Sequence, residues 1–397
     1  MQNQIFSSPN RRIYLDNNAT TFPSARLREK WIEILEASGN ASSVHQEGRL
    51  PKTILRDARR KIADLLSCSA LDIVFNSGAS EGNSSIFNSV FQAIGPAKNE
   101  FLISSVEHPS VAKVAESLKT KGAVIHVIPV NREGQIDLGF IKNKLSSKTA
   151  LVSVMYANNE TGVLHPIKEI TAMAHAAGAL MHTDCVQMLG KCENNFKELG
   201  VDYATFSAHK FYSLKGTGFC YIKNTAPWMP LIFGSQERGR RGGTENITGI
   251  AALNIVLDEL VDMTAKIQHM TSLRDLFESS VKEKIKGVSV TAKNSSRVSN
   301  TSSLVIEGVD GDTLLMSLDL KGFSVSTGAA CSSGSPEPSP VLLSMGLTKA
   351  EAQSSLRVSV GWTNTEDEIK LFFTTLAEVV SKLREMAEQE KRSNHGG

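Results

Sequence analysis

Short apolar segments alternate with helical patterns through the first half of the chain, and this alternation constrains the fold more than any other feature. The segments with the length and composition of strands are 72–75, 101–104, 124–128, 150–155, 179–182, 203–206 and 218–222. Strands that alternate with helices on this scale form a mainly parallel sheet covered on both faces. The sequence therefore predicts an α/β large domain built on a seven-stranded sheet.

The pattern changes in the last third of the chain. A long helical pattern at 247–270 is expected to join two domains, and the chain then alternates irregularly. We expect strands at 304–306 and 356–360, helices at 313–320 and 366–386, and a disordered tail at 391–397. The predicted division is a large α/β domain at 16–262 and a small α+β domain at 1–15 and 263–397.

Composition and charge narrow the class of function. The chain has 397 residues, 41% of them hydrophobic, and a net charge of +2, which predicts a small substrate and no direct contact with nucleic acid. Five scattered cysteines and no Cys-x-x-Cys pair indicate a reducing compartment rather than a disulfide framework. We find no signal peptide at 1–10 and no apolar run long enough to span a membrane, so we expect a cytoplasmic protein.

Two of the predicted strands end in groups that suit one particular cofactor. Asp184 follows the apolar segment 178–181, and Lys210 follows 201–206 after Ser207 and a histidine. Strand ends of a parallel sheet meet at one edge, where ligands bind. A lysine amine that forms a Schiff base and a carboxylate that pairs with a pyridinium are what pyridoxal phosphate (PLP) requires of a protein. The alternative for such a lysine alone is a solvated surface residue.

Other strand ends carry polar groups that suit the same ligand. The turn 76–83 leads into a helix at 84–94, and its amides suit either a phosphate or an ordinary capped helix. His108 ends one strand and Asn159 lies just beyond another, positions where a histidine could lie on an aromatic ring and exchange protons. The glycine-rich basic run 234–246 is expected to be either a mobile anion-binding loop or a solvated connection.

A single cysteine, Cys331, lies in a stretch without large apolar side chains, 328–340. Structural cysteines are usually packed among apolar neighbours, and nothing in this stretch would bury one. We therefore expect an exposed thiol on a mobile arm that can visit a cofactor and then another protein.

Taken together, these motifs resemble the cysteine desulfurases, fold-type-I PLP enzymes that take sulfur from free L-cysteine and release alanine. The resemblance runs from Tyr14-Leu15-Asp16-Asn17-Asn18-Ala19-Thr20-Thr21 to Arg357-Val358-Ser359-Val360-Gly361. The loop Ala330-Cys331-Ser332-Ser333-Gly334, followed by Glu337-Pro338-Ser339, is similar to the long-loop branch that serves iron-sulfur cluster assembly.

The resemblance implies a role for each matching residue. Lys210 binds PLP, Asp184 pairs with the ring nitrogen, Gln187 reaches the ring oxygen, and His108 stacks on the ring and transfers protons with Asn159 nearby. The phosphate would be held by Ala79, Ser80, Ser207 and His209, and by Thr244 of the second subunit of a homodimer. Asn40 and Arg357 would hold the substrate carboxylate, and Cys331 would form the persulfide.

The family pattern implies partners and also shows departures. It implies a sulfur-acceptor or iron-sulfur scaffold protein as partner and no resident metal, although Cys331 could pass sulfur to a cluster or ligate it. Ser80, Cys185, Leu214 and Pro340 depart from the usual residues, and none of them removes a catalytic group. Two alternatives remain open at this point: another fold-type-I enzyme, such as an aminotransferase or selenocysteine lyase, and a scaffold without catalysis.

Overall fold

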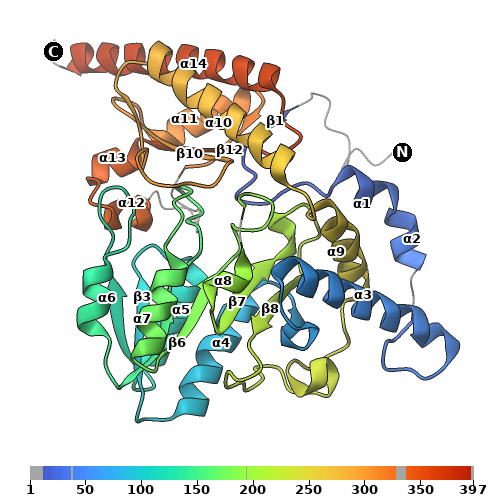
Figure 1. The fold of residues 1–397 in the computed structure, drawn as a ribbon. Coiled ribbons are helices and arrows are strands. Elements are labelled where there is room, and N and C mark those ends of the chain that lie inside the picture. The colour runs from blue at the N-terminus through green and yellow to red at the C-terminus, as the bar shows by residue number, and fades with distance from the viewer. Residues whose placement is uncertain (1–11, 37–38, 194, 328–336, 395–397) are drawn as a thin grey trace.

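A seven-stranded sheet forms the centre of the larger part of the molecule (Figure 1). The computed structural model describes residues 12–36, 39–193, 195–327 and 337–394. The strands are β2 (Ile73–Asn76), β3 (Glu100–Ser104), β4 (Val124–Ile128), β5 (Thr149–Ser153), β6 (Leu180–Asp184), β7 (Tyr203–Ser207) and β8 (Gly218–Ile222). Their order is β2-β8-β7-β6-β5-β3-β4, and β8 alone in this sheet runs antiparallel to its neighbours. The predicted mainly parallel sheet is confirmed.

Helices cover both faces of this sheet because consecutive strand residues point to opposite sides. Phe101 and Ile103 pack with α4 (Ala79–Ile94) and α5 (Pro109–Lys119), while Leu102 packs on the other face. That other face is covered by α3 (Arg49–Leu66), α6 (Leu138–Lys144), α7 (Ile167–Ala176) and α9 (Ile247–Glu259). The short helices are α1 (Ala25–Glu29), α2 (Trp31–Glu36) and α8 (Phe196–Leu199). Both faces are thus buried, as the apolar strands require.

The second part of the molecule is a smaller α+β unit with its own core, above the large sheet in Figure 1. Its strands are β1 (Ile13–Tyr14), β9 (Val288–Val290), β10 (Thr301–Ile306), β11 (Phe323–Ser324) and β12 (Ser355–Ser359). Its helices are α10 (Thr264–Lys284), α11 (Gly311–Leu320), α12 (Pro340–Ser344), α13 (Lys349–Gln353) and α14 (Glu366–Asn394). Strands β9, β10 and β12 form one antiparallel sheet, and β1 pairs in parallel with β11.

Three helical expectations were wrong in detail. The pattern at 247–270 is two helices, α9 and α10, because the chain leaves helical geometry after Glu259 and the Asp262 carboxylate accepts from the Thr264 amide (3.1 Å) at the start of α10. The sequence after Pro23 also predicts one amphipathic helix to about Glu36, but the structure interrupts it at Lys30. The tail expected to be disordered from 391 continues α14 as far as Asn394, and 395–397 lie outside the described residues.

The segment that follows β1 connects the small unit to the large one and passes beside the predicted site. Its Asn17 amide donates to the Ser359 carbonyl (3.1 Å) in the small unit. A few residues later the Thr21 amide donates to the carbonyl of His209 (2.8 Å), beside the predicted lysine. The loop between β7 and β8 is therefore tied to both parts of the molecule.

Ion pairs attach part of the glycine-rich basic run to the large domain, while many of its residues, among them Thr244, are exposed. Glu237 is buried and accepts two hydrogen bonds from Arg59 (2.9 and 2.6 Å), while Arg241 pairs with Glu81 on α4 (2.9 Å). These ion pairs fasten the loop to the large domain.

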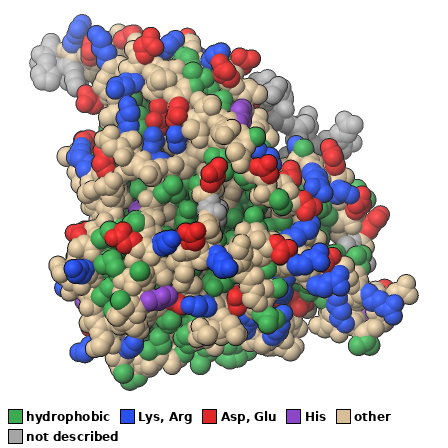
Figure 2. Space-filling model, viewed as in Figure 1, with side chains coloured by type: hydrophobic (Ala, Val, Ile, Leu, Met, Phe, Trp, Pro, Cys, Tyr) green, Lys and Arg blue, Asp and Glu red, His purple; other side chains and the backbone are tan. Residues whose placement is uncertain are grey.

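Elsewhere on the visible face, cationic and anionic side chains are interspersed, in keeping with the nearly equal numbers of basic and acidic residues in the chain (Figure 2). Among the described residues, no helix is both long and apolar enough to cross a membrane.

Candidate active site

Lys210 lies in a 3-10 turn directly after β7, at the carboxyl edge of the parallel strands. Its Nζ donates to the main-chain carbonyls of Asn18 (2.7 Å) and Ala19 (2.8 Å). Burial and, to a lesser degree, the charge of Arg357 lower the pKa of Lys210 to about 8 against the opposing charges of Asp16 and Asp184. At neutral pH about a tenth of an amine with this pKa is deprotonated, far more than for an ordinary lysine, and the deprotonated form is the one that attacks a carbonyl.

Asp184 ends β6, the strand next to β7, and lies beside Thr205 in the register. The carboxylate is buried; Oδ2 accepts from Asn83 Nδ2 (3.0 Å) and Oδ1 from the Val186 amide (3.0 Å). Asn83 is held in turn because its Oδ1 accepts from Thr205 Oγ1 (2.7 Å). Sequence reasoning treated Asn83 only as part of a turn and missed this role.

His108 lies at the end of β3, where it caps α5 through its ring. Nδ1 accepts from the Ser110 amide (3.1 Å) and lies 2.8 Å from Ser110 Oγ, which also accepts from Asn83 Nδ2 (2.9 Å). Although part of the ring is solvent-exposed, burial of the rest lowers the pKa of His108, with opposing effects from the Asp184 and Lys210 charges. Both of those charges therefore act on one imidazole.

The turn before α4 brings together two of the residues predicted to bind the phosphate, Ala79 and Ser207. Gly78 adopts φ +143°, a conformation that disfavours other residues, and the following Ala79 amide donates to Ser207 Oγ (2.8 Å). A Cβ at Gly78 would lie 3.3 Å from Ser207 Oγ, so the glycine keeps this approach open. Ser80 is exposed on the first turn of α4, where helix amides attract anions.

His209 lies at the other side of the lysine turn. Its Nδ1 is 3.0 Å from Thr20 Oγ1. Burial, together with the charges of Lys210, Lys215 and Lys191, lowers the pKa of His209 to about 4. The ring is therefore neutral at physiological pH and can only orient a ligand by hydrogen bonding.

Gln187 and Lys210 donate hydrogen bonds to the same main-chain oxygen, that of Asn18. Gln187 Nε2 donates to the Asn18 carbonyl (3.1 Å), the same oxygen that accepts from Lys210 Nζ. Asn18 is buried, and its Nδ2 donates to the Asn159 carbonyl (3.0 Å). The sequence places Asn18 in the motif that follows Tyr14 without revealing that it joins these groups.

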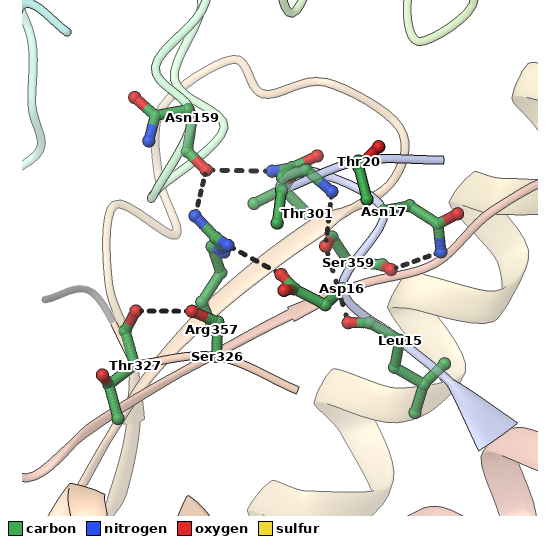
Figure 3. A network of polar contacts seen from close by, with 12 residues as sticks. Leu15, Asp16, Asn17, Thr20, Asn159, Thr301, Ser326, Thr327, Arg357 and Ser359 are labelled. Carbon is green, nitrogen blue, oxygen red and sulfur yellow. Dashed lines mark hydrogen bonds and ion pairs between the residues drawn. The ribbon is translucent and has the colours of Figure 1, made fainter. Parts of the chain in front are cut away.

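Arg357 on β12 reaches into the same region from the small unit (Figure 3). Its Nη2 pairs with Asp16 Oδ1 (2.7 Å), Nη1 donates to the Asn159 carbonyl (3.3 Å), and Nε is buried without a partner among the described residues. The Asn159 side chain points away from this guanidinium in Figure 3, so Asn159 contributes its main chain here. A guanidinium with an unused N–H suits a carboxylate ligand.

Two buried carboxyl groups near the site were also missed by sequence reasoning. Glu107 precedes His108, and its Oε1 accepts from Ser104 Oγ and the Met155 amide (both 2.6 Å); burial raises its pKa to about 8. Glu160 Oε2 accepts from Ser339 Oγ (2.5 Å), and burial raises its pKa to about 7. Neither could be recognised from a pattern, because an acidic residue in a turn usually faces solvent.

Not every predicted residue joins this cluster. Asn40 and Thr244 are exposed, and Asn40 Oδ1 accepts from Ser42 in its own turn (2.8 Å); over the described part of the chain, no bond links either residue to Lys210 or Arg357. Cys331 lies outside the described residues. Among the departures, Cys185 is buried, which raises its pKa and keeps it an inert thiol, and Pro340 begins α12.

The assembled groups fit PLP. A lysine amine, a buried carboxylate, an amide N–H from Gln187 and the N-terminus of α4 surround one edge of the sheet, and Arg357 supplies a guanidinium with an unpartnered N–H. These donors match the functional groups of an aromatic aldehyde that bears a ring nitrogen, a ring oxygen and a phosphate.

Comparisons with known proteins agree with this geometry. The family model "Aminotransferase class-V" matches residues 13–372. A cysteine desulfurase of Trichormus azollae is 38% identical over 94% of this chain and 94% of that protein. Among solved structures, a NifS-like protein shares 33% identity with a TM-score of 0.87, covering 93% of this chain and 99% of that chain. The structure of SspA in complex with cysteine shares 27% identity with a TM-score of 0.76, covering 89% of this chain and all of that chain, 100%. The chain therefore belongs to the class-V aminotransferase family, among its cysteine desulfurases.

Proposed function

We propose that this chain is a PLP-dependent cysteine desulfurase that converts L-cysteine to L-alanine and leaves a persulfide on Cys331. The observation that carries the proposal is that Asp184 and Lys210 follow from the carboxyl ends of the adjacent strands β6 and β7, where both of their charges act on His108. The similarity to a cysteine desulfurase over 94% of the chain supports the same reaction.

PLP supplies an electron sink that stabilises the carbanion formed when a proton leaves the substrate Cα. Lys210 would hold the cofactor through its amine and would take the proton from the substrate; the lowered pKa of Lys210 suits it to act as a base near neutral pH. Asp184 holds a proton on the ring nitrogen, as a buried carboxylate with no cation bonded to it in the described residues can do.

Arg357 is proposed to bind the substrate carboxylate. In the structure Asp16 already pairs with Nη2, so the substrate would use the unpartnered Nε and share or replace the contact with Asp16. His108 is proposed to stack on the ring and to transfer protons, with its tilt fixed by Ser110. Asn40 is proposed to complete carboxylate binding.

The sulfur transfer step is proposed to use Cys331. Its thiolate attacks the sulfur of the bound cysteine and forms the S–S bond, while the Cβ–S bond breaks. The electron pair of that bond stays on carbon, which takes up a proton and becomes the methyl group of alanine. No external oxidant or reductant is required.

A homodimer is proposed to complete the phosphate site. Thr244 is exposed, and the segment just before the glycine-rich loop carries exposed apolar side chains, among them Phe233 (78%) and Leu231 (47%). Exposed side chains of this kind favour contact with a second copy of the chain. Thr244 would then reach the phosphate held by Ala79, Ser80, Ser207 and His209 of the partner.

The persulfide is proposed to pass to an acceptor or iron-sulfur scaffold protein in the cytoplasm. The motif around Cys331, with Glu337-Pro338-Ser339, supports the iron-sulfur branch. Cys331 could also ligate a cluster transiently while it passes on its sulfur. Pull-down with the persulfidated protein would identify this partner.

Replacing Cys331 separates this function from its competitors. C331A is expected to keep the visible absorbance of the lysine-bound cofactor and to lose alanine production from cysteine, whereas C68A, at a half-buried cysteine, should keep both. Continued alanine production by C331A would exclude Cys331 as the acceptor. Assays with selenocysteine test for a selenocysteine lyase, and assays with 2-oxo acids test for an aminotransferase. If C331A loses only the binding of its partner protein, the chain acts as a scaffold.

A further inference from the structure

Lys191 is a buried amine to which neither the cofactor chemistry nor the substrate chemistry assigns a role. Its side chain is 3% exposed. Nζ donates to Asn18 Oδ1 (3.0 Å) and to Gln187 Oε1, and no carboxylate in the described part of the chain forms an ion pair with it. A buried lysine bonded only to neutral oxygens is costly, which calls for an explanation.

Because Lys191 Nζ donates to Asn18 Oδ1 and to Gln187 Oε1, each of the two amides turns its oxygen toward Lys191. Because Oε1 of Gln187 must face Lys191, the NH2 group of Gln187 must point the other way. That group donates to the Asn18 carbonyl (3.1 Å), which also accepts from Lys210 Nζ (2.7 Å). Lys191 thus determines which end of the Gln187 amide faces Lys210.

The Lys191 side chain also orients Asn18. With Oδ1 toward Lys191 and toward Asn300 Nδ2 (3.1 Å), Asn18 Nδ2 is directed at the Asn159 carbonyl (3.0 Å) and Thr301 Oγ1 (2.8 Å). Lys191, Asn18 and Gln187 form a closed ring of hydrogen bonds, and rotation of either amide would place two donors or two acceptors face to face. The ring therefore holds a single arrangement.

We propose that Lys191 is a positioning residue that keeps the N–H groups of Gln187 directed at the ring oxygen of the cofactor. Without Lys191, the amide of Gln187 can rotate and present Oε1, which cannot donate to that oxygen and repels it. This inference rests on the proposed function, because it takes Gln187 as the partner of the ring oxygen.

The main chain of Lys191 has a separate structural role that a side-chain substitution leaves intact. Its carbonyl accepts from the Ser299 amide (3.0 Å) and Ser299 Oγ (2.7 Å) in the small unit. Burial lowers the pKa of the Lys191 amine well below its usual value, the charges of Lys210 and Arg357 act in the same direction, and Cys192 and Asp16 oppose them. A change of the side chain therefore tests the contacts to the amides and not the attachment of the small unit.

The test compares K191M, Q187A and the double variant in the full-length chain. Loss of one donor to the cofactor should weaken PLP binding about three- to tenfold. We expect K191M and Q187A to shift the absorbance of the lysine-bound cofactor equally, and the double variant to add nothing. K61M serves as a matched control, since Lys61 on α3 bonds to the Asn254 carbonyl (3.1 Å) away from the site, and it should leave the spectrum unchanged.

A wild-type spectrum in K191M, or additive shifts in the double variant, would overturn the proposal. K191Q keeps an NH2 donor that can satisfy one of the two oxygens, so its spectrum should lie between those of K191M and wild type; it replaces K191M if that variant does not fold. If the wild-type protein itself shows no lysine-bound cofactor, the proposed function fails. A normal wild-type spectrum with no effect of K191M defeats this inference alone.

Discussion

The side-chain amide of Asn83 lies 3.0 Å from Asp184 Oδ2, so a neutral donor rather than a cation holds the buried carboxylate. The same nitrogen lies 2.9 Å from Ser110 Oγ, which is bonded to His108 Nδ1. Because the described partners of Asp184 are neutral N–H groups, its carboxylate is available to pair with a protonated ring nitrogen. Asn83 connects this carboxylate, through Ser110, to His108, which is proposed to cover the ring.

We expect N83A to lower the unfolding free energy by about 1–3 kcal/mol, because Asp184 and Thr205 each lose a buried partner. PLP should also bind more weakly, and denaturant titration and cofactor titration measure the two effects. N88A is the matched control, since Asn88 on the same helix bonds only to the Ser84 carbonyl (2.8 Å) in the described contacts. Equal effects of N83A and N88A on PLP binding would contradict the role given to Asn83.

Replacement of Lys210 by alanine should remove both the visible absorbance of the bound cofactor and all turnover. The reason is that the nucleophilic amine and the base reside on one side chain. Lys215, five residues later and exposed, provides the control K215A, which should keep both properties. Absorbance spectra and alanine release measure the outcome, and turnover by K210A would place the reaction elsewhere.

R357K is expected to raise KM for cysteine about tenfold or more with a smaller change in kcat, because an ammonium cannot reproduce the two-pronged contact of a guanidinium with a carboxylate. The control is R297K, since the Arg297 side chain is similarly buried and forms a comparable pair, with Glu278 (2.7 Å) instead of Asp16. Steady-state kinetics should show that R297K leaves KM unchanged. An unchanged KM in R357K would mean that the substrate carboxylate binds elsewhere.

The stability of the protein should depend on pH through Glu107. Burial raises the pKa of this carboxyl from 4.5 to about 8, so the folded state retains a proton that the unfolded chain releases. The stabilisation is fully present below pH 4.5 and is lost as the pH rises through the window up to about 8. In E107Q this loss should disappear, because the amide keeps an oxygen for Ser104 and Met155 and does not titrate.

Denaturation at about pH 5 and about pH 8 measures this difference. E116Q alters an exposed carboxylate on α5 that pairs with Lys119 (2.7 Å) and should leave the pH dependence as in the wild type. The same slope in E107Q and wild type would show that Glu107 titrates normally.

Local patterns predicted the sheet well because each strand is a short apolar run bounded by polar turns. They failed at α9 and α10, because the apolar spacing runs through Leu260 and hides the break that Asp262 stabilises. Lys210 and Asp184 could be found because both lie directly after predicted strands. The roles of Asn18 and Lys191 could not be predicted, because these two residues are 173 positions apart in the sequence and meet only in the folded chain.

The ion pair between Asp16 and Arg357 joins residues 341 positions apart. On the ribosome the segment that follows β1 is made early, yet it must wait until β12 has been synthesised before its partners exist. A nascent chain can therefore complete much of the large sheet before the site is formed. A chain truncated before residue 357 should fold only in part and should not form a working active site.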